Sequence, residues 1–146
     1  MALGPGHLNR EQKLLYACVA LSCVTETLST ALLVEMQERA APGMIKATVH
    51  EILTDEINHS RIGWAELSRH TRSRDLSWIS ALLPGMLGEA MQTDVQPMLS
   101  ADEGELDLSE WGILTPKHAQ KIVKEAIQVV IIPGLEQNGI DPSPIQ

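Results

Sequence analysis

The chain has 146 residues, a net charge of −8, 44% hydrophobic residues and 21% charged residues, as expected for one globular domain with its own core. The negative charge and the lack of a Lys/Arg cluster exclude a nucleic-acid surface. There is no Phe and only one Tyr, so Ala, Leu, Ile, Val and Met must fill the core, and Ala, Leu and Met favour helices.

A first helix is predicted over residues 10–39, with Asn9 as its N-terminal cap. From Leu14 to Val34 the only charged residue is Glu26, and this length could cross a bilayer. Five Ser and Thr residues and the central Glu argue against membrane insertion. We therefore expect a bundle helix that is buried on most sides, and no membrane span.

The two cysteines of this helix predict no disulfide. Cys18 and Cys23 are five residues apart, so on an α-helix their side chains point about 140° apart and cannot pair with each other. The N-terminal residues also lack the charged-then-apolar pattern of a signal peptide. The sequence thus predicts a reducing, cytoplasmic location.

A second helix is predicted over residues 45–72, after a Pro-Gly turn that makes the two helices antiparallel neighbours. Glu56 lies at the centre of its apolar stripe, and His59 lies about 60° away. A carboxylate that faces a core without a partner costs several kcal/mol. A metal ion bound by both side chains would offset this cost. Alternatively, the buried Glu56 and His59 could offset it by hydrogen bonding to each other or to a neighbouring helix. The stripe itself is Ile45, Val49, Ile52, Leu53 and Leu67.

The first helix brings a second carboxylate to the same level. The midpoint between Glu26 and Glu56 is residue 41, inside the turn, so an antiparallel hairpin sets both at about the same height. Gly63, one turn beyond His59, either leaves room at this site or allows another helix to approach closely. Small residues flank Glu26 and leave space beside it: Ser22, Cys23, Ser29 and Thr30.

Two further helices are predicted over residues 76–98 and 116–132. Pro84-Gly85 should kink or split the former, and Glu89 should lie at its solvated edge. Residues 101–110 carry five acids without the ordered spacing of a calcium loop, so we expect an exposed loop. Thr115 and Pro116 are a start signal for the last helix, and Pro133-Gly134 should end it.

A helix with one buried Glu, followed by an antiparallel helix with Glu-x-x-His, resembles half of a ferritin-like di-iron carboxylate site. The resemblance covers residues 14–70 and is carried by Thr25-Glu26-Thr27 and by Asp55-Glu56-Ile57-Asn58-His59-Ser60. It implies one all-α domain over 1–146, a ferritin-like helical bundle with a metal-site hairpin at about 10–72 and C-terminal helices at about 76–132.

The resemblance also implies a ligand set. Glu26 would be a terminal or bridging carboxylate, Glu56 a bridging carboxylate, and His59 a nitrogen ligand of iron or, alternatively, manganese. Asp55 would be the acid that orients a ligating imidazole, or else a solvated acid at the edge of the stripe. No catalytic residue is assigned.

A complete site of this kind needs two such helix pairs, and this chain carries one. Either two chains form a homodimer across a two-fold axis, or an N-terminal half that carries the other ligands is missing, or the site is degenerate. The chemistry that we expect is an oxidoreductase reaction of dioxygen or peroxide at reduced iron. The alternative is a non-catalytic helical interaction or structural domain, in which the three side chains form a buried hydrogen-bond network.

Overall fold

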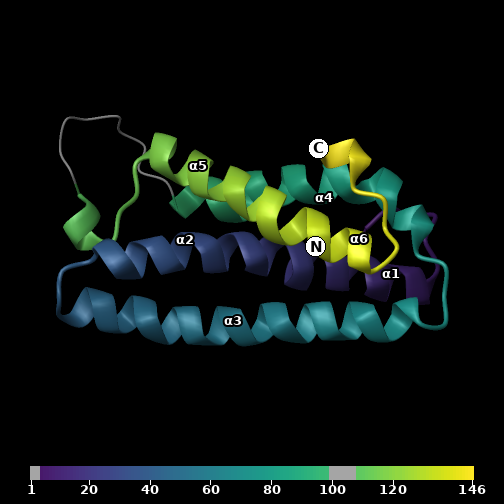
Figure 1. The fold of residues 1–146 in the computed structure, drawn as a ribbon, viewed down its shortest axis with the longest axis horizontal. Coiled ribbons are helices and arrows are strands. Elements are labelled where there is room, and N and C mark those ends of the chain that lie inside the picture. Colours follow the sequence, from purple (N-terminus) through teal and green to yellow (C-terminus); the bar gives the residue numbers. More distant parts are fainter. Residues whose placement is uncertain (1–3, 99–107) are drawn as a thin grey trace.

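In the computed structural model, which describes residues 4–98 and 108–146, these residues form helices and no β-strand, as predicted (Figure 1). Most of the acidic segment that we expected as an exposed loop, residues 101–107, lies outside the described residues. The helices form three layers. The helix over 10–39 lies in the middle, α3 (Met44–Thr71) on one side of it, and the C-terminal helices on the other.

The middle helix runs without a break from Arg10 to Arg39, through α1 (Arg10–Ala17), the π-helix η1 (Cys18–Thr25) and α2 (Glu26–Arg39). Asn9 caps it as predicted: its side chain accepts the Gln12 amide, and the Gln12 side chain returns a hydrogen bond to the Asn9 amide. By length and composition this helix could cross a membrane, and 44% of its most apolar window is buried within the described structure.

The second predicted helix is confirmed as α3, which packs along α2 and η1. Of its 28 residues, only Leu53, Gly63 and Leu67 are fully buried. Ile45 and Ile52, which the apolar stripe placed toward a core, are 36% and 44% exposed. The reason is that, within the described residues, α3 packs mainly along the middle helix, so part of its stripe stays open to solvent.

The C-terminal layer starts with the third predicted helix, which changes from a 3-10 to an α-helical form at Leu83, next to Pro84. The last helix begins as predicted, with the Thr115 side chain accepting the His118 amide. It does not end at Pro133, however, but continues to Gln137. The elements that follow α3 in the chain are η2 (Ser77–Leu82), α4 (Leu83–Ala90), η3 (Met91–Val95), η4 (Gln96–Met98), η5 (Ser109–Trp111), α5 (Pro116–Ala126), η6 (Ile127–Ile131), α6 (Ile132–Gln137) and η7 (Ser143–Ile145).

The continuation past Pro133 has a local cause. Proline has no N–H to donate and its ring crowds the carbonyl one turn earlier, which normally breaks an α-helix. Here the π-helical η6 directly precedes α6, and Pro133 lies in the first turn of α6. A π-helical turn shifts the backbone hydrogen bonds by one residue at this point, so the continuous helix accommodates the missing donor of Pro133 there.

The core lies between the middle helix and the layers on both of its sides, and aliphatic side chains fill it, as the composition predicts. Its largest fully buried members are Leu28, Leu32, Leu67, Ile79, Leu83, Met86, Ile131, Leu135 and Ile140.

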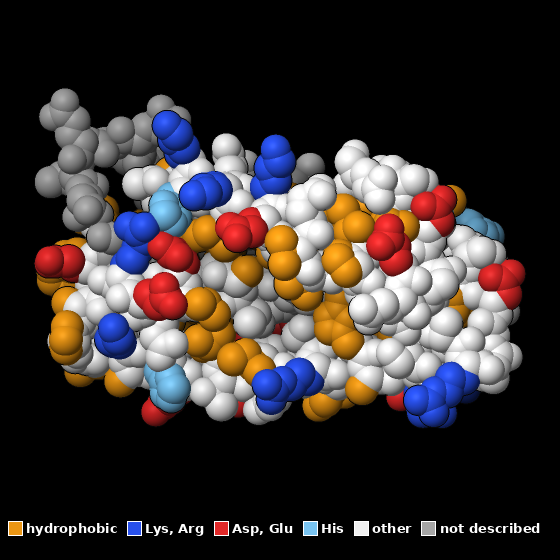
Figure 2. Space-filling model, in the orientation of Figure 1, with side chains coloured by type: hydrophobic (Ala, Val, Ile, Leu, Met, Phe, Trp, Pro, Cys, Tyr) orange, Lys and Arg blue, Asp and Glu red, His pale blue; other side chains and the backbone are white. Residues whose placement is uncertain are grey.

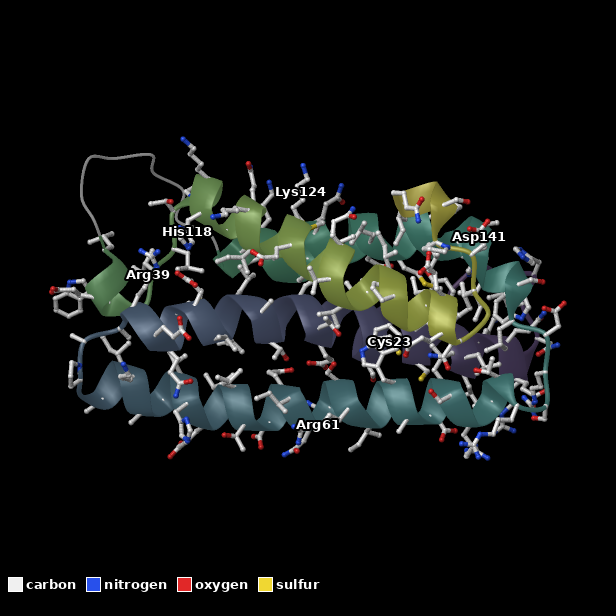
Figure 3. The ribbon with its side chains drawn as sticks, in the orientation of Figure 1. Cys23, Arg39, Arg61, His118, Lys124 and Asp141 are labelled. Atoms are coloured by element: carbon white, nitrogen blue, oxygen red, sulfur yellow. The ribbon has the colours of Figure 1, made fainter. Side chains whose placement is uncertain are left out.

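A polar cluster joins α2 to α5 at one end, where Arg39 and His118 point toward each other (Figure 3). Glu35 binds both, and the hydrogen bonds from Arg39 and then His118 hold the pKa of its carboxyl below the usual value.

Gly63 lies in close contact with the middle helix. A Cβ atom at this position would lie 2.3 Å from the Ser22 Cβ and 2.9 Å from the Ser22 carbonyl carbon. Of the two interpretations of Gly63, close helix approach is therefore the one that the structure supports. We expect Gly63→Ala to push the helices apart and to lower the free energy of unfolding by about 1–3 kcal/mol, measured by urea denaturation.

Gly88→Ala in α4 is the matched control for this substitution. A Cβ atom at Gly88 would meet nothing within 4 Å, so alanine should leave stability unchanged or raise it by up to about 1 kcal/mol through its higher helix propensity. Equal stability of Gly63→Ala and wild type would contradict the tight contact.

Candidate metal centre

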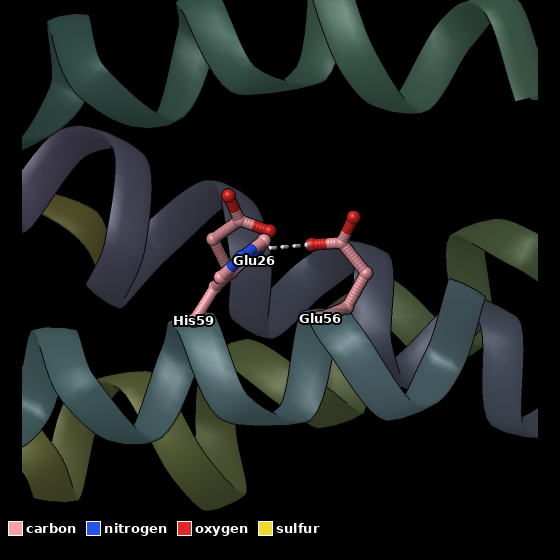
Figure 4. Close-up of side chains that lie close together, drawn as sticks. All are labelled: Glu26, Glu56 and His59. Atoms are coloured by element: carbon pink, nitrogen blue, oxygen red, sulfur yellow. Dashed lines mark ion pairs between the residues drawn. The ribbon is translucent and has the colours of Figure 1, made fainter. Parts of the chain in front are cut away.

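Glu26, Glu56 and His59 come together between the middle helix and α3, as the hairpin spacing predicts. One ligand atom from each of the three lies within 4.8 Å of the others. Glu26 projects from α2, and Glu56 and His59 project from adjacent turns of α3 toward it (Figure 4). Two carboxylates and an imidazole at this separation could share one ion.

The backbone that carries Glu26 is unusual. Glu26 begins α2 directly after the eight π-helical residues of η1. Thr25 Oγ1 donates a hydrogen bond to the Ala20 carbonyl oxygen at 3.0 Å. This side-chain bond spans five residues, as the backbone hydrogen bonds of a π-helix do. π-helical turns are rare and occur frequently at functional sites, because they re-aim the side chains that follow them.

One atom at this site has no hydrogen-bond partner. Glu56 Oε2 is buried, and no described group donates to it. The nearest imidazole nitrogen, His59 Nδ1, is 3.8 Å away, which is an ion-pair distance but too long for a hydrogen bond, so both atoms could still bind a common ion (Figure 4). A buried carboxylate oxygen without a donor costs free energy, and a cation would remove this cost. This donor set therefore fits a metal ion.

The site is open on one side. The His59 side chain is 56% exposed and that of Glu56 is 24% exposed, so solvent reaches the imidazole edge. In the space-filling view, hydrophobic side chains border a hollow between α3 and the α5–α6 segment (Figure 2). Three ligands and an open side leave coordination positions for water, substrate or further protein ligands.

Sequence reasoning missed a hydrogen-bonded group beside the ligands. Thr27 is buried between α2 and α3, and its hydroxyl oxygen accepts a hydrogen bond from Trp64 Nε1 at 3.2 Å. Its own hydrogen is then free to be donated to Ser60 Oγ, 3.1 Å away. Thr27 and Ser60 directly follow Glu26 and His59 in the sequence, so this bond fixes the register of the two ligand-bearing helices.

The other predicted neighbours of the site have different roles. Ser22 packs against Gly63, and the Thr30 hydroxyl, one turn after Glu26, is buried without a described partner. Asp55 and Glu89 are both exposed, in agreement with their interpretation as solvated acids.

The expectation that Cys18 and Cys23 point apart is wrong. The segment that carries them is π-helical, so residues five apart lie close to one face of the helix, and the two thiols are near enough to lower the pKa of Cys18 and to raise that of Cys23. The 140° estimate holds only for an α-helix. Both cysteines are free thiols.

The described residues thus bring together two carboxylates and one imidazole on a helical hairpin, next to a buried oxygen that has no donor. The all-helical fold is consistent with many kinds of helical protein and does not identify a family by itself. Comparisons with protein families, curated proteins and solved structures found no match, so the chemistry of this site is the basis for a functional assignment.

Proposed function

We propose that this chain is a ferritin-like metal-binding protein in which Glu26, Glu56 and His59 hold iron, with manganese as the alternative ion. The observation that carries the proposal is the buried Glu56 Oε2, which has no donor among the described residues although Glu26 and His59 face it. Mixed carboxylate and imidazole ligation suits iron and manganese better than a closed zinc site, which is typically rich in cysteine.

The roles of the residues follow from their positions. The two carboxylates would balance the charge of a divalent cation, and His59 would offer a ring nitrogen from its exposed side. The Thr27–Ser60 hydrogen bond would hold the ligand-bearing helices in register while an oxidant approaches from solvent. Bound ferrous iron would supply the electrons for the reduction of dioxygen or peroxide, which is the oxidoreductase chemistry that we propose.

A complete two-metal site needs a second Glu and Glu-x-x-His pair. We propose that a second copy of this chain supplies it across a two-fold axis, or that an N-terminal half does so in a longer protein. In support, the apolar side chains Ile52 and Ile62 in the middle of α3 are 44% and 67% exposed in the described part of the chain. A partner helix pair would cover these side chains and bring ligands to the open side of the site.

A non-catalytic structural domain is the second candidate. The observation that favours it is the Thr27, Ser60 and Trp64 network, which joins α2 to α3 through protein groups alone. The two candidates differ in metal binding, because a structural domain has no need of Glu56 Oε2 as a ligand. A metal titration therefore separates them.

The test is anaerobic titration of the metal-free protein with ferrous iron, followed by calorimetry and by metal analysis after dialysis. We expect His59→Ala to weaken binding by at least about tenfold, since it removes a direct ligand and even indirect supporting residues contribute tenfold or more. His50→Ala is the matched control: His50 is exposed on the same helix and binds Gln37. Equal affinity of wild type and His59→Ala would contradict the proposed site.

A further inference from the structure

An apolar groove of about 350 Å³ lies in the C-terminal layer, where α5 and η6 pass η3. Val123 and Ile127 line it one helical turn apart, and Met91 of η3 and Ile145 of η7 complete its apolar surface. Met91, Ile127 and Ile145 pack against the core but are only half-buried. The groove therefore keeps apolar side chains within reach of a molecule from solvent.

Polar side chains border the same groove along α5 and η6. Gln120, Lys124 and Gln128 line it at four-residue intervals, so they lie along one side of the helix, and all three are exposed. Among the described residues, Lys124 is the only charged side chain that lines the groove, and it has no ion pair. Figure 2 shows Lys and Arg side chains over α5, and Figure 3 labels Lys124 on this helix.

The size of the groove favours a small molecule over a protein segment. A helix with its side chains is about 10 Å wide or more, whereas small-molecule sites begin at about 300 Å³ and are mostly apolar with a few polar groups. A water molecule takes up about 30 Å³, so the groove has room for roughly ten groups of that size, such as the carbon atoms of one acyl chain. One unbranched chain fits this space.

The polar edge favours an anionic head group on that chain. The protein has a net charge of −8 and repels anions in general, so an anion needs a local cation to bind. Lys124 supplies an ammonium group without an ion pair, and the amides of Gln120 and Gln128 add N–H donors at the same edge. A carboxylate accepts hydrogen bonds from groups of both kinds. The Lys124 stem can meanwhile cover the apolar chain.

We propose that this groove binds a free fatty acid of medium chain length. Its chain would lie along Val123, Ile127, Met91 and Ile145, and its carboxylate would bind the Lys124 ammonium group. The site uses neither Glu26 nor any other proposed metal ligand, so it goes beyond the proposed metal function and is independent of it.

The test is calorimetric titration of the full chain with octanoate, decanoate and dodecanoate, each below the concentration at which it forms micelles. A metal chelator is present, so a failure of the metal proposal does not affect the result. We expect one saturable site per chain. The affinity should rise about two- to fourfold with each added methylene group, because each one is removed from water in the groove.

Lys124→Glu should weaken decanoate binding by about tenfold and leave the binding of decanol unchanged, because it replaces an attraction for the carboxylate with a repulsion. Lys117→Glu is the matched control. Lys117 is exposed seven residues earlier on α5 and does not line the groove. It is thus about 10 Å along the helix axis from Lys124, beyond the screening length of about 8 Å at physiological salt, and its effect should stay below about twofold.

Ile127→Gln tests the apolar surface and should weaken decanoate and decanol alike. Circular dichroism establishes that each variant is folded, and Ile127→Ala replaces Ile127→Gln if the amide unfolds the helix. Four results would overturn the proposal: no saturable binding of any of the three fatty acids, an affinity independent of chain length, equal effects of Lys124→Glu and Lys117→Glu, or binding only to phosphatidylglycerol vesicles in a sedimentation assay. The last result would indicate a membrane surface instead of a free fatty acid.

Discussion

Replacing Glu56 with methionine is expected to stabilise the metal-free chain and to abolish its response to iron. Glu56 Oε2 is buried without a donor, and such a group costs about 1–3 kcal/mol, a cost that an apolar side chain of similar length avoids. Wild type, in contrast, should gain about 2.7 kcal/mol at a free ferrous iron concentration of about 100 times the Kd. Thermal denaturation with and without ferrous iron measures both effects.

Glu51→Met is the matched control, because Glu51 is exposed on the same helix. It should leave the metal-free stability nearly unchanged and should keep the rise in Tm with iron. A Glu56→Met variant that is less stable than wild type without metal and that still responds to iron would contradict a ligand role for Glu56. A substitution that raises stability but removes function is common at sites where a buried polar group binds a ligand.

The convergence of Glu26 and Glu56 could be predicted from the sequence because it depends on two simple features. A Pro-Gly turn fixes where the chain reverses, and equal distances from the turn set two residues of an antiparallel hairpin at the same height. The helix starts at Asn9 and Thr115 could be predicted for a similar reason, since a cap is a local bond between a side chain and a nearby amide.

The π-helical turns could not be predicted. Their hydrogen bonds shift by one residue for reasons of packing against neighbouring helices, and no local spacing of side chains signals this. This shift turns Cys18 toward Cys23, and η6 leads the last helix past Pro133 into α6. An α-helical wheel applied to these segments therefore misplaces side chains within the π-helical turns, as it does for Cys18 and Cys23.

The hydrogen bonds beside the ligands have a signal in the sequence. Thr27 and Ser60 each follow a predicted ligand, and Trp64 lies one turn after Ser60 on the same face of α3. Polar side chains that face another helix need partners, so such residues on the facing sides of two neighbouring helices favour a bond between the helices. The exposure of Ile52 had no such signal, because a sequence pattern shows which face is apolar and not what covers it.

Self-pairing is the second large effect that we expect. The mass of the chain in solution, measured by light scattering, should be that of a homodimer, and ferrous iron should strengthen it. The reason is that each chain presents three ligands on an open side of the site, next to the exposed Ile52 of α3. A metal that binds ligands of both chains stabilises the dimer by its binding free energy. Glu56→Ala should therefore lose the effect of iron on the dimer.

Two lysine substitutions test whether the chains pair through the exposed face of α3 or through another part of the surface. Ile52 lies seven residues before His59, on the same side of the helix. Ile52→Lys would therefore bury a charge in the homodimer, and it should weaken self-association by at least about tenfold. Trp111→Lys is the control, because Trp111 is 64% exposed in η5 beside the turn at the end of the hairpin. A chain that stays monomeric with and without iron would contradict self-pairing, and the missing ligands would then have to come from an N-terminal half.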